Sequence, residues 1–161
     1  MINLFSGTPG SGKSLYATYY LIRELKTGRG VIANFAINED FFKKPVNFLY
    51  RDNSELTVPF LVQYSKDNHI PNKEHQTTVI IDEAGVKFNV RDWDVKDRIQ
   101  WIKFFTLHRK LGYDFILISQ FDKMLSVSIR ALICLSSILS NCEIRIKSYP
   151  NFLCRVKNFI H

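Results

Sequence analysis

The feature that most constrains this chain is a glycine-rich segment near its start. A short apolar stretch from Ile2 to Phe5 leads into Gly7-Thr-Pro-Gly-Ser-Gly-Lys-Ser14, which fits the pattern G-x-x-x-x-G-K-[ST] at every position. An amphipathic helical pattern follows directly and continues to Lys26. A strand, a glycine-rich loop and a helix in this order are the context that a phosphate-binding P-loop requires. A glycine-rich turn that matches by chance is the alternative, and the flanking pattern makes it the weaker one.

The chemistry of such a loop is anion binding. Glycines adopt backbone angles that a Cβ forbids, so successive N–H groups can point at one anion, and the helix adds its positive N-terminal end. We expect Lys13 to act catalytically on the β- and γ-phosphates of ATP, and the Ser14 hydroxyl to ligate Mg²⁺. The residues predicted to bind the nucleotide are Gly7, Thr8, Pro9, Gly10, Ser11, Gly12, Lys13, Ser14 and Leu15.

A second signal is the segment Thr77-Thr-Val-Ile-Ile-Asp-Glu83, a β-branched run that ends in two acids. This is the Walker B pattern, in which the first acid, Asp82 here, holds Mg²⁺ through water opposite Ser14. The second acid, Glu83, is placed to polarise the attacking water as a general base. An adjacent glutamate favours NTPases of the additional-strand type, the motors and recombinases, over small kinases and GTPases.

Two polar residues in apolar strand patterns are further candidates. Gln120 follows a predicted strand at 113–119, at the carboxyl end where ligands meet an open α/β sheet. It is a candidate catalytic residue that contacts the γ-phosphate or the attacking water; a simple strand cap is the alternative. Asn34 lies in the apolar run that follows the first helix. It is either a ligand or sensor, or it makes a hydrogen bond to a neighbouring loop, which we favour.

The remaining pattern predicts an α/β fold with a mostly parallel sheet flanked by helices, in a single domain spanning residues 1–161. A strand–helix–strand unit at 1–37 implies a parallel pair with a right-handed crossover. Residues 38–76 are predicted to be an insertion over one sheet edge, because they are polar and contain prolines. The other expected elements are a short strand at 46–50, a short strand or helical turn at 60–64, a loop at 84–94, a helix at 95–110, a helix at 121–130, a strand at 132–139 and a C-terminal antiparallel hairpin at 141–161.

Composition narrows the class of protein. The apolar share of 46% describes a globular chain, and the net charge of +7 indicates a polyanionic partner, either nucleic acid or an anionic membrane surface. A lysine-rich soluble protein without such a partner is the alternative. No apolar run approaches the roughly 18 residues that span a bilayer, and we expect no signal peptide. The three cysteines lack C-x-x-C spacing, so we expect reduced cytosolic thiols and no cysteine metal site.

Taken together, the motifs resemble the cytoplasmic ATPase domain of the zonula occludens toxin (Zot) family, which includes the assembly and export ATPases of filamentous phages. The Walker motifs are shared by many NTPases, whereas the His-Arg…Gly-x-Asp…Ser-Gln run is more specific. The family's fold implies a RecA-like sheet, and its activity implies Mg²⁺-dependent ATP hydrolysis that drives virion assembly and extrusion. The matching segments, which cover most of the chain, are the P-loop, Val79-Ile-Ile-Asp-Glu-Ala-Gly85, Phe104-Phe-Thr-Leu-His-Arg-Lys-Leu-Gly-Tyr-Asp114, Leu117-Ile-Ser-Gln120 and Ile129-Arg130.

The resemblance also implies partners. Motors of this class form homo-oligomeric rings, such as hexamers, and complete each site with an arginine from the neighbouring subunit. Arg109 and Arg130 are the candidates, with surface ion pairs as the alternative role for both. We favour Arg109 because it belongs to the more specific His-Arg pair. Single-stranded DNA or phage coat and assembly proteins are the expected cargo, and the expected location is the cytoplasm, at the cytoplasmic face of the host inner membrane.

One departure from the family concerns length. Family members typically continue into a membrane-spanning segment and a periplasmic part, neither of which these 161 residues contain, so membrane attachment is expected only through a further part. Two other functions stay open. One is a DNA-packaging or transfer ATPase of a non-filamentous element, and the other is a scaffold or effector that uses ATP as a switch. Glu83 favours turnover over the switch.

Overall fold

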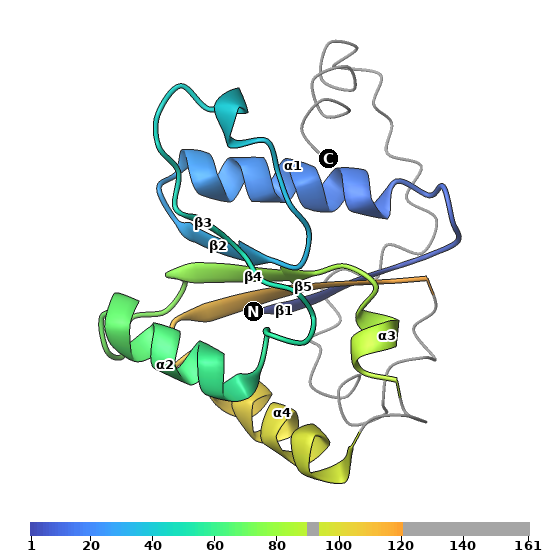
Figure 1. Ribbon diagram of the computed structural model, residues 1–161, viewed down its shortest axis with the longest axis vertical. Helices are drawn as coiled ribbons and strands as arrows, with labels where there is room; N and C mark the ends of the chain where they lie inside the picture. The colour runs from blue at the N-terminus through green and yellow to red at the C-terminus, as the bar shows by residue number, and fades with distance from the viewer. Residues whose placement is uncertain (90–93, 121–161) are drawn as a thin grey trace.

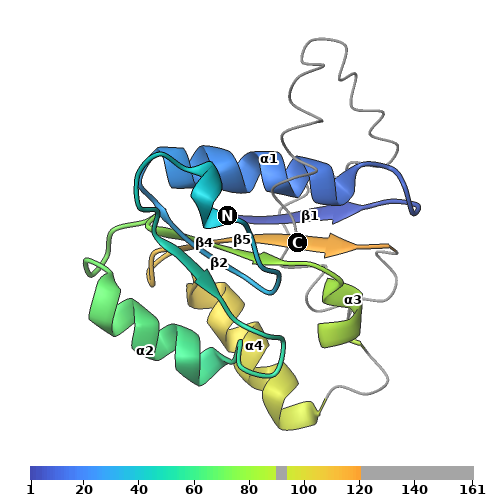
Figure 2. The same ribbon diagram turned by 45° about the horizontal axis from the view of Figure 1, so that its top comes forward.

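The computed structural model describes residues 1–89 and 94–120, which form a parallel β-sheet with helices on both faces (Figure 1, Figure 2). The strand order is β1-β5-β4-β2-β3, and every pairing is parallel. The strands are β1 (Ile2–Ser6), β2 (Gly30–Ala33), β3 (Phe48–Tyr50), β4 (Thr77–Ile81) and β5 (Tyr113–Ser119). The helices are α1 (Lys13–Lys26), the short 3₁₀ turn η1 (Glu39–Phe41), α2 (Val58–Asn68), α3 (Ala84–Lys87) and α4 (Val95–Leu107).

The position of β5 decides the class of this sheet. β5 lies between β1, which leads into the glycine-rich loop, and β4, which ends next to the two acids. A strand inserted between these two is the additional strand that the adjacent acids Asp82 and Glu83 predicted. The α/β architecture and the additional-strand class are therefore confirmed by the order of the strands.

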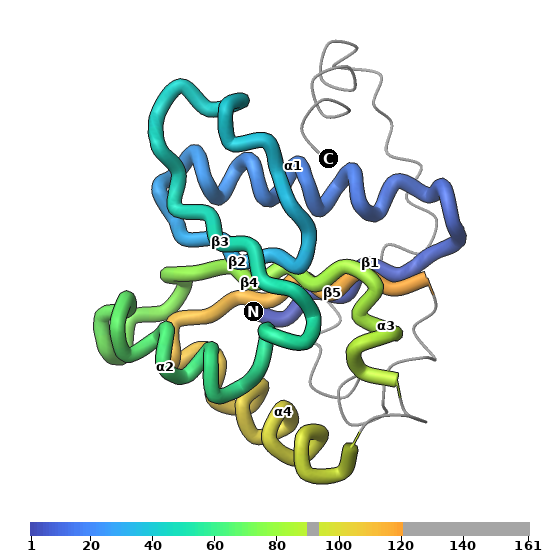
Figure 3. Tube along the Cα trace, viewed as in Figure 1, coloured from blue at the N-terminus to red at the C-terminus, as the bar shows by residue number. Residues whose placement is uncertain are grey.

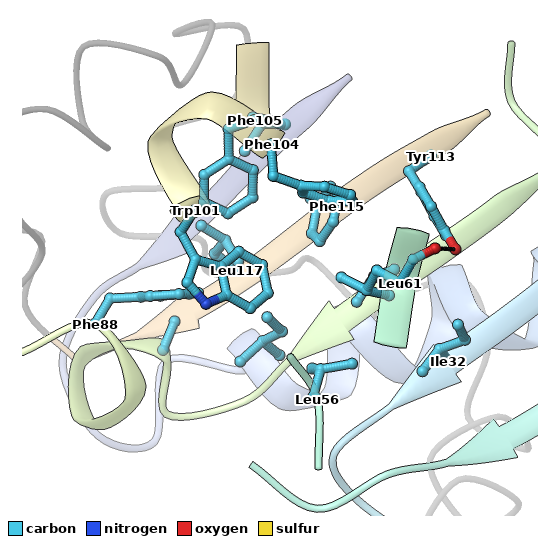
Figure 4. Packing of buried hydrophobic residues seen from close by; sticks show 14 of the residues in the cluster. Ile32, Leu56, Leu61, Phe88, Trp101, Phe104, Phe105, Tyr113, Phe115 and Leu117 are labelled. Carbon is cyan, nitrogen blue, oxygen red and sulfur yellow. Dashed lines mark hydrogen bonds between the residues drawn. The ribbon is translucent and has the colours of Figure 1, made fainter. Parts of the chain in front are cut away.

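Side chains alternate between two hydrophobic cores, one on each face of the sheet. β4 directs Val79 and Ile81 to the face covered by α2, α3 and α4, and Ile80 to the face covered by α1. Because both faces are covered, all five residues of β4 are buried, which explains its unbroken β-branched sequence. The α2–α4 face is built largely from aromatic rings in edge-to-face or tilted contact (Figure 4), namely Phe88, Trp101, Phe104, Phe105, Tyr113 and Phe115.

Two segments differ from the sequence-based prediction. Residues 60–64, expected as a short strand or a helical turn, belong to the full helix α2. Its start is set by Thr57, whose Oγ1 accepts a hydrogen bond from the Phe60 N–H at 3.3 Å, and by a proline in the first turn. Residues 84–87, expected as loop, form α3, because Ala84 and Phe88 turn into the ring-lined core.

The other boundaries shift by a few residues. The strand expected at 46–50 is β3, so the segment 38–76 supplies an edge strand of the sheet as well as α2. β2 ends at Ala33 instead of residue 37, and α4 ends at Leu107 instead of residue 110. The helix at 121–130, the strand at 132–139, the hairpin at 141–161 and Arg130 lie outside the described residues. Within the described ranges, no helix has the length and apolar character needed to cross a bilayer.

Candidate nucleotide-binding site

The glycine-rich loop connects β1 to α1 at the end of the sheet where β1 and β5 both finish (Figure 3). Gly10 and Gly12 have φ angles of 79° and 84°, which residues with a Cβ rarely adopt. A Cβ on Gly10 would meet no atom within 4 Å, so the requirement there is conformational and not steric. No side chain of the described chain caps the N-terminus of α1, which begins after Gly12. The N–H groups of its first turn can therefore serve an anion.

Lys13 points back over this loop. Its ammonium donates hydrogen bonds to the Gly7 carbonyl at 2.7 Å and the Thr8 carbonyl at 2.9 Å, and it lies 3.3 Å from Ser11 Oγ. These contacts hold a positive charge at the mouth of the loop, beside the N-terminus of α1. The loop thus concentrates one full charge and several N–H dipoles where phosphate oxygens would bind.

Ser14 and Asp82 come together from different elements. Ser14 lies in the first turn of α1 and Asp82 directly follows β4, and the Ser14 hydroxyl donates to Asp82 Oδ2 at 3.4 Å. Among the described residues, no group of three His, Cys, Asp or Glu side chains could bind a metal ion. One hydroxyl and one carboxylate instead suit Mg²⁺, which usually takes one or two protein oxygens, substrate phosphates and water. The donor set therefore fits a magnesium–nucleotide complex.

Glu83 sits in an unusual backbone conformation. Its φ and ψ angles of 51° and 41° are left-handed, and its N–H donates to Asp82 Oδ1 at 2.8 Å. A residue with a Cβ adopts these angles at an energetic cost, and such residues concentrate at functional sites. The conformation ends β4 abruptly and starts α3, and it leaves the Glu83 side chain exposed next to the Ser14–Asp82 pair. A general base requires this access to water.

Asn34 has a more direct role than the sequence suggested. It follows β2, the neighbour of β4, and its carboxamide spans the main chain of Asp82. Asn34 Nδ2 donates to the Asp82 carbonyl at 2.9 Å, and Asn34 Oδ1 accepts from the Asp82 N–H at 2.7 Å. Nδ2 also donates to Asn53 Oδ1 at 2.9 Å, in the loop between β3 and α2. The favoured interpretation, a hydrogen bond to a neighbouring loop, is confirmed, and the clamp on Asp82 is added to it.

Gln120 lies at the same end of the sheet. Ser119 is paired in register with Ser6, so Gln120 follows β5 just where Gly7 follows β1, and its side chain is exposed. This position is compatible with contact to a γ-phosphate or an attacking water. Because β1 and β5 end side by side, Gln120 lies beside the P-loop.

Arg109 is not brought to this site within one subunit. It precedes β5, whereas the site lies beyond the carboxyl end of that strand, roughly 20 Å away at about 3.3 Å per residue. Its side chain is exposed, while the preceding His108 is buried against Phe115, and burial lowers the pKa of that imidazole. Arg109 is therefore too far from the P-loop of its own chain to contact a nucleotide bound there.

A glycine-rich loop after β1, an acidic pair after β4 and an additional strand between them define the fold of a P-loop NTPase of the additional-strand class. A family model described as "Zonular occludens toxin (Zot)" matches residues 1–154, and the chain belongs to this family. The Gene 1 protein of Enterobacteria phage I2-2 is 28% identical over 124 residues, which make up 74% of this chain and 34% of that protein. The Gene 1 protein of Enterobacteria phage M13 is 27% identical over 122 residues, or 71% of this chain and 34% of that protein. The chain thus spans about a third of the length of these relatives.

Solved structures share the fold. The N-terminal domain of zonular occludens toxin from Neisseria meningitidis has a TM-score of 0.53 and 24% identity, covering 82% of this chain and 72% of that chain. A genome packaging NTPase from Sulfolobus turreted icosahedral virus 2, in complex with ATP-gammaS, has a TM-score of 0.57 and 22% identity, covering 82% of this chain and 71% of that chain. At sequence identities of 22% and 24%, the similarity shows a shared fold.

Proposed function

We propose that this chain is the ATP-hydrolysing domain of a motor that drives filamentous phage assembly and export or moves single-stranded DNA. The observation that carries the proposal is the convergence of the P-loop, the Ser14–Asp82 pair, Glu83 and Gln120 at the carboxyl end of one parallel sheet. Phosphate binding, metal binding and water activation need these groups at one place. Membership of the Zot family and the phage relatives support the biological setting.

The residues divide the work of hydrolysis between binding and chemistry. The P-loop N–H groups and the Lys13 ammonium bind the β- and γ-phosphates and stabilise the charge that develops on them. Ser14 and Asp82 would hold Mg²⁺, which when bound neutralises phosphate charge. The Glu83 carboxylate accepts a proton from the water that attacks the γ-phosphorus, and the Gln120 amide orients that water or the γ-phosphate.

We extend the proposal to the assembly. The protein forms a homo-oligomeric ring, such as a hexamer, in which exposed Arg109 reaches the neighbouring subunit's nucleotide. Its distance from its own P-loop supports action in trans. Single-stranded DNA or phage coat and assembly proteins are the cargo, and the work is done in the cytoplasm at the face of the host inner membrane.

Phosphate release tests the proposal. Purified protein with ATP should release phosphate only when Mg²⁺ is present, and circular single-stranded DNA should raise the rate. ATP binding without turnover would instead favour a nucleotide-gated scaffold. Turnover that single-stranded DNA leaves unchanged would assign the motor to protein cargo, and a chain that neither binds nor hydrolyses ATP would overturn the proposal.

A further inference from the structure

We propose that Asn34 is a positioning residue for hydrolysis, which holds the turn carrying Asp82 and Glu83 in its working geometry with the help of Asn53 and Lys87. This inference rests on the proposed ATP hydrolysis and adds three residues that none of the nucleotide motifs contains. Asn34 directly follows β2, Asn53 lies in the β3–α2 loop, and Lys87 is the last residue of α3. Asn34 contacts main-chain atoms of the acidic turn, and Asn53 contacts the side chain of Asn34 and the ammonium of Lys87.

The first element is the clamp on the peptide that joins Asp82 to Glu83. Asn34 Nδ2 donates to the carbonyl of this peptide at 2.9 Å, and Asp82 Oδ1 accepts from its N–H at 2.8 Å. Both polar atoms of the peptide are therefore engaged, and its plane is fixed. The orientation of this plane sets the direction in which Glu83 leaves the strand, in the left-handed conformation that a residue with a Cβ otherwise avoids.

The second element is the complementarity of a carboxamide to the main chain. Asn34 uses Nδ2 as a donor to the Asp82 carbonyl and Oδ1 as an acceptor from the Asp82 N–H, at 2.9 and 2.7 Å. Asparagine carries a donor and an acceptor on one short planar group. An aspartate of the same shape would keep the acceptor but would direct an oxygen at the Asp82 carbonyl and at Asn53 Oδ1. Hydrogen bonding, and not side-chain size, is thus the requirement at this position.

The third element is a common anchor for both ends of the turn. Asn53 accepts from Asn34 through its side chain at 2.9 Å and from the Lys87 ammonium through its main-chain carbonyl at 2.6 Å. Lys87 also lies over the Trp101 ring, 5.4 Å from its centre, and burial lowers the pKa of its ammonium. The start of the acidic turn and the end of α3 are therefore tied to the same residue.

The loop that carries Asn53 is itself held by several contacts. The Arg51 N–H donates to the Ala33 carbonyl at 2.9 Å, which joins the start of the loop to β2. Asp52 accepts from the Ser54 N–H at 3.2 Å and from its hydroxyl at 2.8 Å. Leu56, at the other end of the loop, is fully buried in the α2–α4 core. These attachments restrain the loop that supports the acidic turn, and proton transfer by Glu83 depends on such positioning.

The test compares Asn34→Ala, Asn34→Asp and Asn53→Ala with Asn68→Ala, whose side chain donates to the Tyr64 carbonyl at the other end of the sheet. We expect Asn34→Ala and Asn34→Asp to lower kcat by about 10- to 100-fold, because a small misplacement of catalytic groups costs this much. The Kd for ATP should stay within about threefold, since the P-loop is untouched. Asn53→Ala should have a smaller effect of the same kind, and Asn68→Ala none.

A double variant separates positioning from general structural damage. If Asn34 acts through Glu83, adding Asn34→Ala to Glu83→Gln should lower kcat by less than about threefold further. Effects that multiply would overturn the proposal, as would an unchanged kcat in Asn34→Ala. Amide exchange by NMR keeps the proposal separable from the ATPase function. The Asp82 amide, bonded to Asn34 Oδ1, should exchange at least about tenfold faster in Asn34→Ala. Wild-type protein without turnover contradicts the ATPase function, and unchanged Asp82 exchange contradicts the clamp.

Discussion

At the amino ends of the strands, several polar side chains are paired with main-chain groups and with one another, whereas at the carboxyl ends several are directed toward solvent. His69 bridges the Leu111 carbonyl at 2.6 Å and Thr77 Oγ1 at 2.7 Å, and buried Tyr113 donates to the Leu61 carbonyl at 2.8 Å. At the carboxyl ends, Glu83 and Gln120 are exposed, and the Glu83 backbone is left-handed.

This difference separates stability from activity along one sheet. Side chains such as His69, Gln76 and Tyr113 join the segments at the amino end through hydrogen bonds within the fold, so changes there should mainly lower the free energy of unfolding. The carboxyl end keeps exposed polar groups in place for a ligand, so changes there should mainly lower turnover. Each variant below is expected to affect one property and spare the other.

The largest effect is expected for Lys13→Ala. Losing the ammonium that the Gly7 and Thr8 carbonyls now hold should lower ATP hydrolysis by about a thousandfold or more. Because Lys13 lies at the carboxyl end, the urea midpoint should hardly move. Lys66→Ala, on the exposed surface of α2, is the matched control and should retain wild-type turnover. Normal hydrolysis by Lys13→Ala protein would end the NTPase interpretation.

Arg109→Ala should cause the next largest loss, about a thousandfold if the guanidinium completes a neighbouring site. Because Arg109 and the P-loop of one subunit lie at opposite ends of β5, inactive Arg109→Ala mixed with inactive Glu83→Gln should recover part of the activity. One mixed interface then contains both intact groups. Specific activity should also fall on dilution. No recovery on mixing, with a rate independent of protein concentration, would rule out the trans arginine.

Gly112→Ala tests how much close packing at the amino end of the sheet contributes to stability. Gly112 has a φ of 83°, and a Cβ there would lie 2.7 Å from Gln76 Nε2 and 2.9 Å from His69 Nδ1. Since Gln76 Nε2 is already bonded to two carbonyls, it cannot easily move away. We expect a loss of about 2–4 kcal/mol in the free energy of unfolding, from backbone strain and overpacking together. Turnover per folded molecule should be unchanged.

Gly28→Ala is the matched control for this variant. Gly28 has a φ of 81° but nothing within 4 Å of an added Cβ, so only the backbone term of about 1–2 kcal/mol applies. Urea denaturation of both variants measures the difference. Equal destabilisation of the two would show that close packing at the amino end contributes nothing.

The smallest expected effect is a pH dependence of stability that arises from histidines at the amino end of the sheet. Burial lowers the pKa of His69 below its unfolded value of about 6.5, and it lowers that of His108 as well. The folded state therefore binds fewer protons, so the stability is fully present above about pH 6.5 and falls as the pH drops below it. The urea midpoint should decrease between about pH 7.5 and 5.5, and less so in His69→Gln. A midpoint that rises on acidification would contradict this assignment.

The sequence predicted the binding loop well because its signal is local. Lys13 and Ser14 are neighbours within one motif, and the strands at 77–81 and 113–119 are long, apolar runs. The role of Asn34 could not be obtained this way, because its partner Asp82 becomes a neighbour only through the pairing of β2 with β4. The four residues of α3 are too few to show helical periodicity.

The position of Arg109 relative to the nucleotide site also depends on the topology of the sheet. In the sequence, Arg109 lies shortly before the strand at 113–119. Because β5 is parallel to β1, Arg109 lies at the amino end of β5, and the nucleotide site lies at the carboxyl end. The left-handed backbone of Glu83 had no sequence signal, since glutamate rarely adopts it. Contacts with residues distant in sequence, such as the hydrogen bond from Asn34 to the Asp82 carbonyl, offset the energetic cost of this conformation.

The central claim is that Glu83 acts as the general base at the carboxyl end of the sheet, and Glu83→Gln tests it most directly. The variant keeps Asp82 for the metal and removes the base with little change in shape. Single-turnover hydrolysis measured beside the Kd for ATP should show a rate lower by about a hundred- to ten-thousandfold and an affinity close to that of wild type. A wild-type single-turnover rate together with a collapsed ATP affinity would contradict the account, because Glu83 would then support binding and not hydrolysis.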